Sequence, residues 1–493
     1  MSAFVYENSQ ELTMEPSLIY VLRKGIIMNI LLVTLGCDKN TADSERMLGL
    51  INKSGYNLTS DPEEADVAVV NTCCFIESAT QESIDKLLEL SELKEGRLKY
   101  LICTGCMAQR YKDQIENELT EVDAFIGTMS LDSIVEVIDE LVTRDNGYKS
   151  DAEDASNGEN SDDSSKHKIT RYDELDAPYP DRSVVERIVT ERPYLEYLKI
   201  ADGCDKRCTY CAIPYFKGKY KSVPMEAIID EAKILANSGV KELILVAQET
   251  TCYGIDLYGE KRLHLLLREL SKIDGIEWIR LLYAYPEEIY PELIKEMASN
   301  PKVLHYIDMP IQHTEDNVLR RMGRRIDNAG IKRVVEELRE YIPDIVIRTT
   351  IITGFPGETI DEHEKLLDTL AELGLDHVGV FAYSQEEGTP AASFDGQIDD
   401  DTKNERLEDI MLLQKDISAD ILSGYVDKEF DVIIDGYLPD DDVYVGRSFM
   451  DAPDIDGMVF IDSPRELISG EIVRVRITDS DLYDLEGRLV EGA

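Results

Sequence analysis

Residues 203–211 read GCDKRCTYC and place Cys204, Cys208 and Cys211 in one short loop. Soft thiolates at this spacing suit an iron–sulfur cluster, which normally takes four cysteine ligands. Three cysteines would leave one iron open, where the amino and carboxylate groups of S-adenosylmethionine (SAM) could bind. A zinc site would need a fourth local Cys or His, and the loop has none. The spacing therefore favours a cluster over zinc or structural thiols.

Around this loop, apolar runs alternate with helical patterns. The loop directly follows a run at Leu195–Ile200, and a helical stripe from Met225 ends near Gly239, a C-cap residue. Repeated units of this kind predict a full or partial (β/α) barrel, whose ligands gather in the loops at the carboxyl ends of the strands. The later strand candidates are Glu242–Ala247, Ile276–Leu282, Val303–Met309, Ile345–Ile352 and His377–Phe381.

Towards the N-terminus lies a second α/β region. Strand-like runs at Asn29–Leu35, Asp66–Val70 and Leu98–Thr104 alternate with helical patterns at Thr41–Lys53 and Ala79–Leu93. This order predicts a parallel sheet.

A second group of cysteines follows these three strands. Cys37, Cys73 and Cys106 each lie just beyond one strand, so they should meet at the sheet edge where such folds bind ligands. Cys103 lies inside its apolar run and is interpreted as a small hydrophobic residue. A thioredoxin-like redox pair of Cys103 and Cys106 is the alternative.

The 493 residues divide into several predicted parts. Residues 145–170 form an acidic linker, since Asp145–Lys166 carries seven acids and one large apolar residue. After Ser423, short alternating strands predict a small all-β barrel. The predicted division is an extension without clear structure at 1–27, an α/β domain at 28–144, the linker at 145–170, the barrel-like domain at 171–424 and the β-barrel at 425–493.

Charge and composition narrow the class of partner. The formal net charge of −47, with eighteen acidic and six basic residues in Tyr425–Ala493, opposes binding to phosphate backbones. A basic protein fits better, although a merely solvated or salt-adapted acidic surface is the alternative. The chain has no apolar run of bilayer length and no signal-peptide pattern, so we expect a cytoplasmic protein without a membrane partner.

Several strings together resemble the methylthiotransferase family of radical SAM enzymes, over about Met28 to Arg488. The strings are the radical cysteine triad, Leu35–Cys37, Asn71–Cys73, Gly105–Ala108, Gly354–Thr359 and an ending like the TRAM domain. The resemblance implies two [4Fe–4S] clusters. Cys204, Cys208 and Cys211 would hold the cluster that generates the 5′-deoxyadenosyl radical. Cys37, Cys73 and Cys106 would hold an auxiliary cluster that supplies or carries sulfur.

Within the family, four strings look like the RimO branch. They are Ala247–Thr251, Asp256–Gly259, Asp308–His313 and Glu386–Thr389. The branch implies a transferase that methylthiolates the β-carbon of one aspartate in small-subunit ribosomal protein S-twelve. Such an enzyme would consume two SAM molecules and need an electron donor and a sulfur source. The tRNA-modifying branch is the nearest alternative, and a non-catalytic iron–sulfur electron carrier is an alternative of another class.

Other residues have weaker signals. Three residues at or near the ends of predicted strands are candidates to line a SAM pocket, namely Gln248, Arg348 and Gly354, with barrel packing as the alternative. His313 and His377 are interpreted as packing residues. An aliphatic C–H has no acidity that a general base could use at neutral pH, so no general acid or base is assigned.

Overall fold

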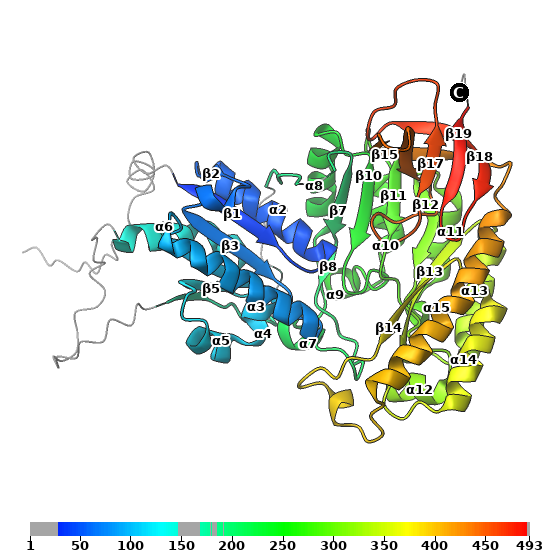
Figure 1. Ribbon diagram of the computed structural model, residues 1–493, viewed down its shortest axis with the longest axis horizontal. Helices are drawn as coiled ribbons and strands as arrows, with labels where there is room; N and C mark the ends of the chain where they lie inside the picture. The colour runs from blue at the N-terminus through cyan, green and yellow to red at the C-terminus, as the bar shows by residue number, and fades with distance from the viewer. Residues whose placement is uncertain (1–27, 146–167, 178, 180–184, 191, 491–493) are drawn as a thin grey trace, which may run out of the picture.

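The computed structural model describes residues 28–145, 168–177, 179, 185–190 and 192–490, which form three successive bodies (Figure 1). The predicted extension at 1–27 and residues 146–167 of the predicted linker lie outside the described residues. Of the helices that the structure describes, none combines the length and apolar character that crossing a bilayer requires.

The N-terminal body is a parallel sheet with helices on both faces, as predicted. Its strand order is β2-β1-β3-β4-β5-β6. Helices α2 and α6 pack on one face, and α3, α4 and α5 pack on the other. The elements are β1 (Asn29–Thr34), α2 (Asp38–Lys53), β2 (Asn57–Leu58), β3 (Val67–Thr72), α3 (Glu77–Glu92), β4 (Tyr100–Gly105), α4 (Cys106–Arg110), α5 (Lys112–Glu118), β5 (Ala124–Ile126), α6 (Ile134–Asp145) and β6 (Ile169–Arg171).

Three strands of this sheet were not predicted from the sequence. Strands β2, β5 and β6 have two or three residues each, too few to show a period. Strand β6 pairs with β5 from the far side of residues 146–167. The N-terminal sheet therefore takes in a strand that falls across the expected limit at residue 170.

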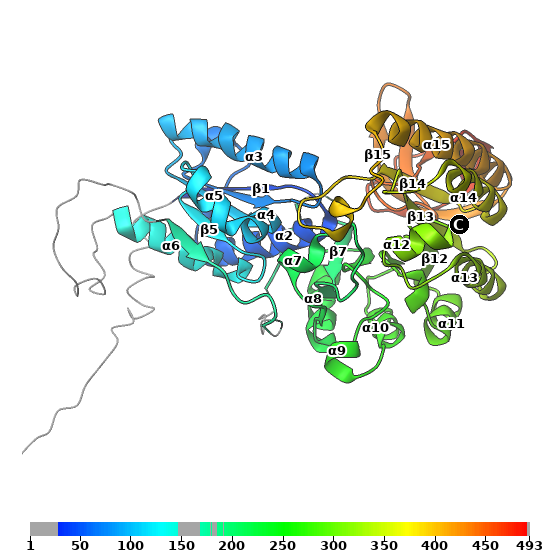
Figure 2. The same ribbon diagram turned by 90° about the horizontal axis from the view of Figure 1, so that it is seen from below.

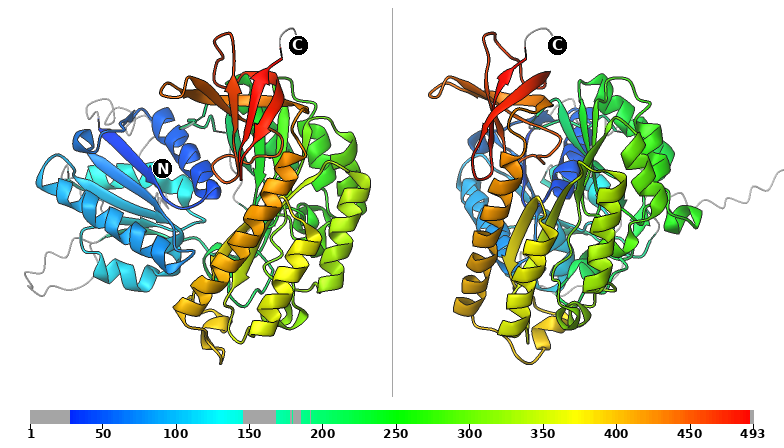
Figure 3. Two further views of the ribbon diagram at one scale, coloured as in Figure 1. Left: turned by 45° about the vertical axis from the view of Figure 1, so that its right-hand side comes forward. Right: turned by 90° about the vertical axis from the view of Figure 1, so that its right-hand side faces the viewer.

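The central body is a second parallel sheet, with strand order β14-β13-β12-β11-β10-β7. Strands β7 and β14 lie at opposite edges, so the predicted barrel is a partial one. Helices pack on its outer face and leave an inner face open to other parts of the chain (Figure 3). The elements are β7 (Leu195–Lys199), α8 (Met225–Asn237), β10 (Glu242–Val246), α9 (Ile255–Tyr258), α10 (Leu263–Leu270), β11 (Trp278–Leu281), α11 (Pro291–Ser299), β12 (Val303–Asp308), α12 (Asp316–Arg321), α13 (Asn328–Tyr341), β13 (Val346–Thr353), α14 (Ile360–Leu373), β14 (His377–Ala382) and α15 (Asp400–Ser423).

Local signals set the limits of these helices. Helix α8 ends just before Gly239, whose φ of 107° is the left-handed conformation expected after a C-terminus. Helix α14 begins at a capping box, in which Thr359 and Glu362 satisfy each other's backbone N–H groups. The predicted stripe from Met225 is thus confirmed as a helix.

The C-terminal body is a closed five-stranded barrel, in the order β15-β16-β17-β19-β18. Its apolar interior is continuous with inner-face side chains of the central sheet, including Trp278, Leu304 and Tyr306. Five residues of β19 were not predicted as a strand. The strands are β15 (Glu429–Leu438), β16 (Val443–Arg447), β17 (Val459–Asp462), β18 (Ile472–Ser480) and β19 (Leu485–Leu489).

A buried charge network joins this barrel to the sheet. Glu242 on β10 accepts hydrogen bonds from Arg280 Nε (2.8 Å) and Arg447 Nη1 (2.9 Å). The side chains of Glu242, Arg280 and Arg447 are 0%, 0% and 3% exposed. Burial alone would raise the pKa of Glu242, but Arg447 and Arg280 hold it below its ordinary value. The carboxylate therefore stays charged and anchors both guanidinium groups.

We expect Glu242→Gln to destabilise this junction by about 3–5 kcal/mol, because buried Arg280 would lose its charge partner and Arg447 would keep only Asp435. Trp278, the one tryptophan of the chain, lies at the junction and reports on it by fluorescence. The urea midpoint of Trp278 emission should fall. Glu269→Gln, which removes an exposed pair with Lys272, is the control and should change stability by less than about 1 kcal/mol. Equal midpoints for the two variants would contradict the assignment.

Candidate functional site

The GCDKRCTYC loop projects from the carboxyl end of β7. Strands β8 (Ala201–Asp202) and β9 (Lys221–Ser222) pair at its base, and Cys204 N–H donates to the carbonyl of Gly218 (3.1 Å). Cys204 and Cys208 are buried, and Cys211 is partly buried. The three predicted cluster ligands thus lie on one closed loop.

Other elements hold this loop from outside. Thr209 N–H donates to the carbonyl of Met322, which follows α12 (2.9 Å). The carbonyl of Thr209 accepts from Ala391 N–H (2.9 Å). Lys206 N–H lies 3.4 Å from Cys204 Sγ, so a backbone donor already points at one of the sulfurs. The loop is held on both sides before any cofactor binds.

The three N-terminal cysteines converge as the strand order predicts. Thr72 pairs with Gly105 across β3 and β4, so the next residues, Cys73 and Cys106, leave adjacent strands at the same level. A β-carbon added to Gly36 would lie 2.8 Å from Cys73 Sγ, which places the turn before Cys37 against Cys73.

Two glycines make this convergence possible. Gly36 has a φ of 93°, and Gly105 has φ 93° and ψ −149°, a conformation essentially restricted to glycine. A β-carbon on Gly105 would collide with Asn71 Oδ1 and lie 2.9 Å from Thr72 O. Backbone approach at these turns therefore excludes every other residue type.

Thiols in both groups of cysteines are buried. Burial raises the pKa of Cys73 and of Cys106, and raises the pKa of Cys204 to about 12. These thiols are therefore neutral near pH 7 in the metal-free protein, and metal binding must release their protons.

Buried cations lie beside the N-terminal cysteines. Lys217, 3% exposed, lies 3.4 Å from Asp202 Oδ2; burial alone would lower its pKa, but Asp202 and Cys106 raise it. Lys39 pairs with Asp38 (3.0 Å), next to Cys37. Buried positive charge would compensate the negative charge of a cluster held by thiolates. The three N-terminal cysteines and their surroundings therefore fit an iron–sulfur cluster.

No described group of three or more His, Cys, Asp or Glu side chains is gathered tightly enough for a single metal ion. A four-iron cluster is larger, and each of its cysteines binds a different iron. All nine cysteines lie in the described part of the chain, and none forms a disulfide. Cys103 is buried inside β4, as predicted for a small hydrophobic residue.

Both cysteine groups lie where the N-terminal and central bodies meet, with α4 against α7 (Ile213–Lys217) (Figure 2). On one side Tyr283 hydroxyl donates to Asp38 Oδ1 (3.1 Å), and Lys39 Nζ lies 3.3 Å from the Tyr283 ring centroid. Tyr283 has a φ of 58°, a strained conformation for a bulky residue and one that concentrates at functional sites.

On the other side Glu386 joins the same two bodies. Its carboxylate accepts from Glu77 N–H at the start of α3 (3.1 Å) and lies 3.6 Å from Arg110 Nη1. Arg110 also donates to the carbonyl of Cys74 (2.8 Å). The string Glu386–Thr389, singled out by sequence, thus holds the N-terminal cysteine region against the central sheet.

Glu249 is a further candidate for the site, which sequence reasoning did not assign. It follows β10, is 1% exposed, and accepts from Thr251 N–H through Oε1 (2.8 Å). Its Oε2 has no hydrogen-bond partner among the described residues. Burial raises the pKa of Glu249 to about 7. A buried acid directly after an apolar strand was the available sequence signal.

The candidate SAM-pocket residues have different outcomes. Gln248 follows β10 with its side-chain Oε1 buried and lacking a partner in the described chain. Arg348 instead pairs with Asp308 (2.9 Å) and with Asp456 of the terminal barrel (3.3 Å). A β-carbon on Gly354 would meet Lys403 of α15. Arg348 and Gly354 therefore have packing partners, and their place in a SAM pocket stays a prediction.

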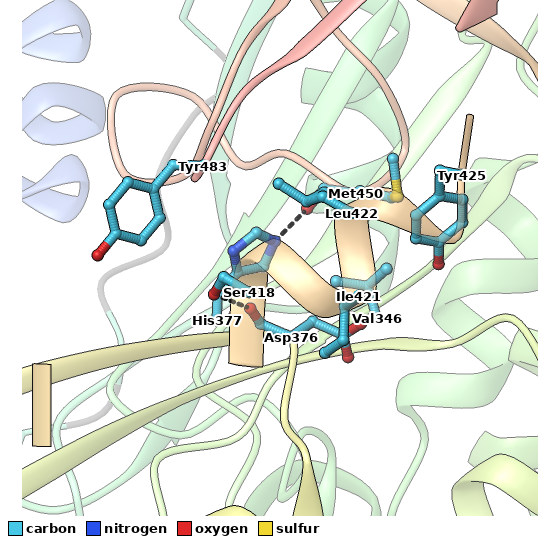
Figure 4. A pocket seen from close by; sticks show the side chains of 9 residues that line it. All are labelled: Val346, Asp376, His377, Ser418, Ile421, Leu422, Tyr425, Met450 and Tyr483. Atoms are coloured by element: carbon cyan, nitrogen blue, oxygen red, sulfur yellow. Dashed lines mark hydrogen bonds between the residues drawn. The ribbon is translucent and has the colours of Figure 1, made fainter. Parts of the chain in front are cut away.

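The two histidines are packing residues, as interpreted from sequence. His313 is fully buried, and its Nδ1 accepts from Glu315 N–H (3.0 Å). His377 lies 3.0 Å from the carbonyl of Met450 in a small pocket between the central sheet, α15 and the terminal barrel (Figure 4). No cysteine lines this pocket, so we place no chemistry there.

Comparisons with known proteins identify the family. Residues 29–127 match Uncharacterized protein family UPF0004, residues 198–378 match the Radical SAM superfamily and residues 426–490 match the TRAM domain. The ribosomal protein uS12 methylthiotransferase RimO of Lachnoclostridium phytofermentans is 48% identical over 463 residues, covering 93% of this chain and 99% of the relative. RimO of Acetivibrio thermocellus is 47% identical, covering 93% and 98%.

This chain belongs to the RimO family. It is therefore a transferase of the radical SAM class, and the family uses SAM and two [4Fe–4S] clusters. Among solved structures, the radical SAM methyltransferase TsrM from Kitasatospora setae is similar, with a TM-score of 0.52, 15% identity and 74% of each chain covered. That likeness concerns the fold alone.

We expect Gly105→Ala to remove the auxiliary site while leaving the radical site. After anaerobic reconstitution, the iron content should fall from about eight to about four per chain. Gly55→Ala is the matched control, because Gly55 also has a positive φ (86°) but no atom within 4 Å of the added β-carbon. It should keep about eight irons. A full iron content in Gly105→Ala would contradict the steric argument.

Glu249→Gln should change the pH dependence of stability in the metal-free protein. The folded-state pKa near 7 exceeds the unfolded value of 4.5, so wild type loses stability as pH rises between them. Gln keeps the acceptor for Thr251 but cannot ionise. In urea unfolding, the variant should match wild type at pH 5 and exceed it at pH 8 by up to about 3 kcal/mol. A pH-independent difference would refute the assignment.

Proposed function

We propose that this chain inserts a methylthio group at the β-carbon of an aspartate in ribosomal protein uS12. The observation that carries the proposal is the pair of cysteine triads, each at the carboxyl ends of parallel strands, in a chain of the RimO family. Cys204, Cys208 and Cys211 would hold the radical cluster. Cys37, Cys73 and Cys106 would hold the auxiliary one.

When bound, the clusters and SAM supply radical chemistry, a methyl group and sulfur, which suit an aliphatic C–H that no general base can deprotonate at neutral pH. The chain's own part is to bind, orient and exclude water. The buried Oε2 of Glu249 is suited to accept a hydrogen bond from the amino group of SAM. Tyr283 and Glu386 hold the two cysteine regions in a fixed relation.

The charge of the chain supports a basic protein substrate. Eighteen acidic against six basic residues in the terminal barrel oppose tRNA and favour a ribosomal protein. We therefore favour uS12 over tRNA, and catalysis over simple electron transfer. Because ribosomal proteins are made and assembled in the cytoplasm, we place the enzyme there.

The test is an anaerobic one. Iron should fall from about eight to about four per chain when Cys204, Cys208 and Cys211 are all replaced by Ala. Wild type, with SAM and a reductant, should add a methylthio mass to uS12 at an aspartate, whereas the triple variant should not. Iron falling from about four to none would leave only one cluster and remove the basis for sulfur insertion. Modification of tRNA in place of uS12 would assign the other branch.

A further inference from the structure

Arg324, in the turn between α12 and α13, is a fully buried cation whose hydrogen bonding is incomplete. Its side chain is 0% exposed, and its Nη2 donates to Pro310 O (3.0 Å) and to Glu287 Oε2 (3.2 Å). Nε and Nη1 have no hydrogen-bond partner in the described chain. Donors left unpaired at this depth are costly, and more so on a charged group.

Arg324 lies next to the GCDKRCTYC loop. Its neighbour Gly323 packs so closely that an added β-carbon would lie 3.6 Å from Cys208 Cα. The guanidinium carbon lies 4.2 Å from the ring centroid of Tyr285, whose hydroxyl is 3.8 Å from Cys208 Sγ. Arg324 is therefore in the same layer of side chains as the radical-site cysteines.

Beyond its ion pair, Arg324 has two donors, Nε and Nη1, that lack an acceptor in the described chain. Glu287 is its one ion-pair partner among the described residues, and Glu287 is engaged through Nη2 alone. Thiolates and sulfides of an iron–sulfur cluster are anionic acceptors, and the adjacent loop is where they would lie. The donors of a guanidinium form a rigid fork, so Nε and Nη1 can donate to neighbouring acceptors of one group.

Resting on the function proposed above, we propose that Arg324 donates hydrogen bonds through Nε and Nη1 to the sulfurs of the radical cluster and so sets its reduction potential. Hydrogen bonds to the sulfurs and nearby charge are among the factors that fix the potential of such clusters. A positive donor stabilises the reduced state, which carries one more negative charge. Arg324 thereby makes the cluster easier to reduce by the external electron donor.

The test is a potentiometric titration of the reconstituted full-length enzyme, followed by electron paramagnetic resonance. The signal that changes when SAM is added identifies the radical cluster, and the auxiliary cluster serves as an internal reference. In Arg324→Met, the ratio of reduced to oxidised radical cluster at a fixed potential should fall at least tenfold, which is about 59 mV. The reduction potential of the auxiliary cluster should stay the same. Arg324→Lys keeps the charge without the fork and should fall in between.

Two further variants separate a charge effect from structural damage. Glu287→Gln leaves Arg324 in place without its counter-charge, so the radical cluster should become easier to reduce, opposite to Arg324→Met. Arg325→Met removes the same charge from the adjacent, exposed position and should leave both potentials unchanged. A shift in one direction for both Arg324→Met and Glu287→Gln would indicate damage and overturn the proposal.

The remaining outcomes are equally decisive. An unchanged potential in Arg324→Met together with weaker SAM binding would assign the donors to the SAM carboxylate and overturn the proposal. Iron analysis distinguishes failure of the proposal for Arg324 from failure of the proposed function. A full cluster content with unshifted potential refutes only the role of Arg324. Loss of the radical cluster from the wild-type preparation would refute the proposed function itself.

Discussion

Buried ion pairs between the N-terminal body and the central sheet fix the geometry on which the site depends. Arg187 Nη2 bonds Glu45 of α2 (2.5 Å) and also Glu196 of β7, and all three side chains are 2–3% exposed. Lys199 of β7 pairs with Asp43 of α2 in the same way. Charges at this depth are tolerated only when well paired, so a shift of α2 along β7 would leave ions unpaired. Since Cys37 directly precedes α2 and the GCDKRCTYC loop follows β7, the same pairs fix one cysteine group relative to the other.

Much of the fold could be predicted because its strands carry continuous apolar runs. The runs at Asn29–Leu35 and Glu242–Ala247 became β1 and β10 with ends shifted by one residue. Parallel order then placed Cys37, Cys73 and Cys106 at one edge without any distance information. Strands β2, β5 and β6 escaped prediction because two or three residues show no period, and β19 escaped because its sequence LEGRL has large apolar residues only at its two ends. Whether the central sheet closes also depends on its edge partners.

Buried charges were the features that sequence patterns could not assign. The sequence marks Glu249 only by its place after an apolar strand and does not mark Arg324, and only folding shows that each is buried with polar atoms lacking a partner in the described chain. Arg348 and Gly354 show the converse difficulty, since they lie in or just after a strand and have packing partners that the local sequence does not reveal. Their neighbours, Asp456 and Lys403, come from elements more than 40 residues later in the chain. Such long-range partners decide between a packing role and a ligand role.

The Glu242–Arg447 pair also has a consequence for how the protein is made. The two residues are 205 positions apart, so at about 5–20 residues per second Glu242 leaves the ribosome about 10–40 s ahead of Arg447. During that interval the inner face around Trp278 has no terminal barrel to cover it. A nascent chain of this protein therefore presents an apolar sheet face with an incompletely paired charge at its centre.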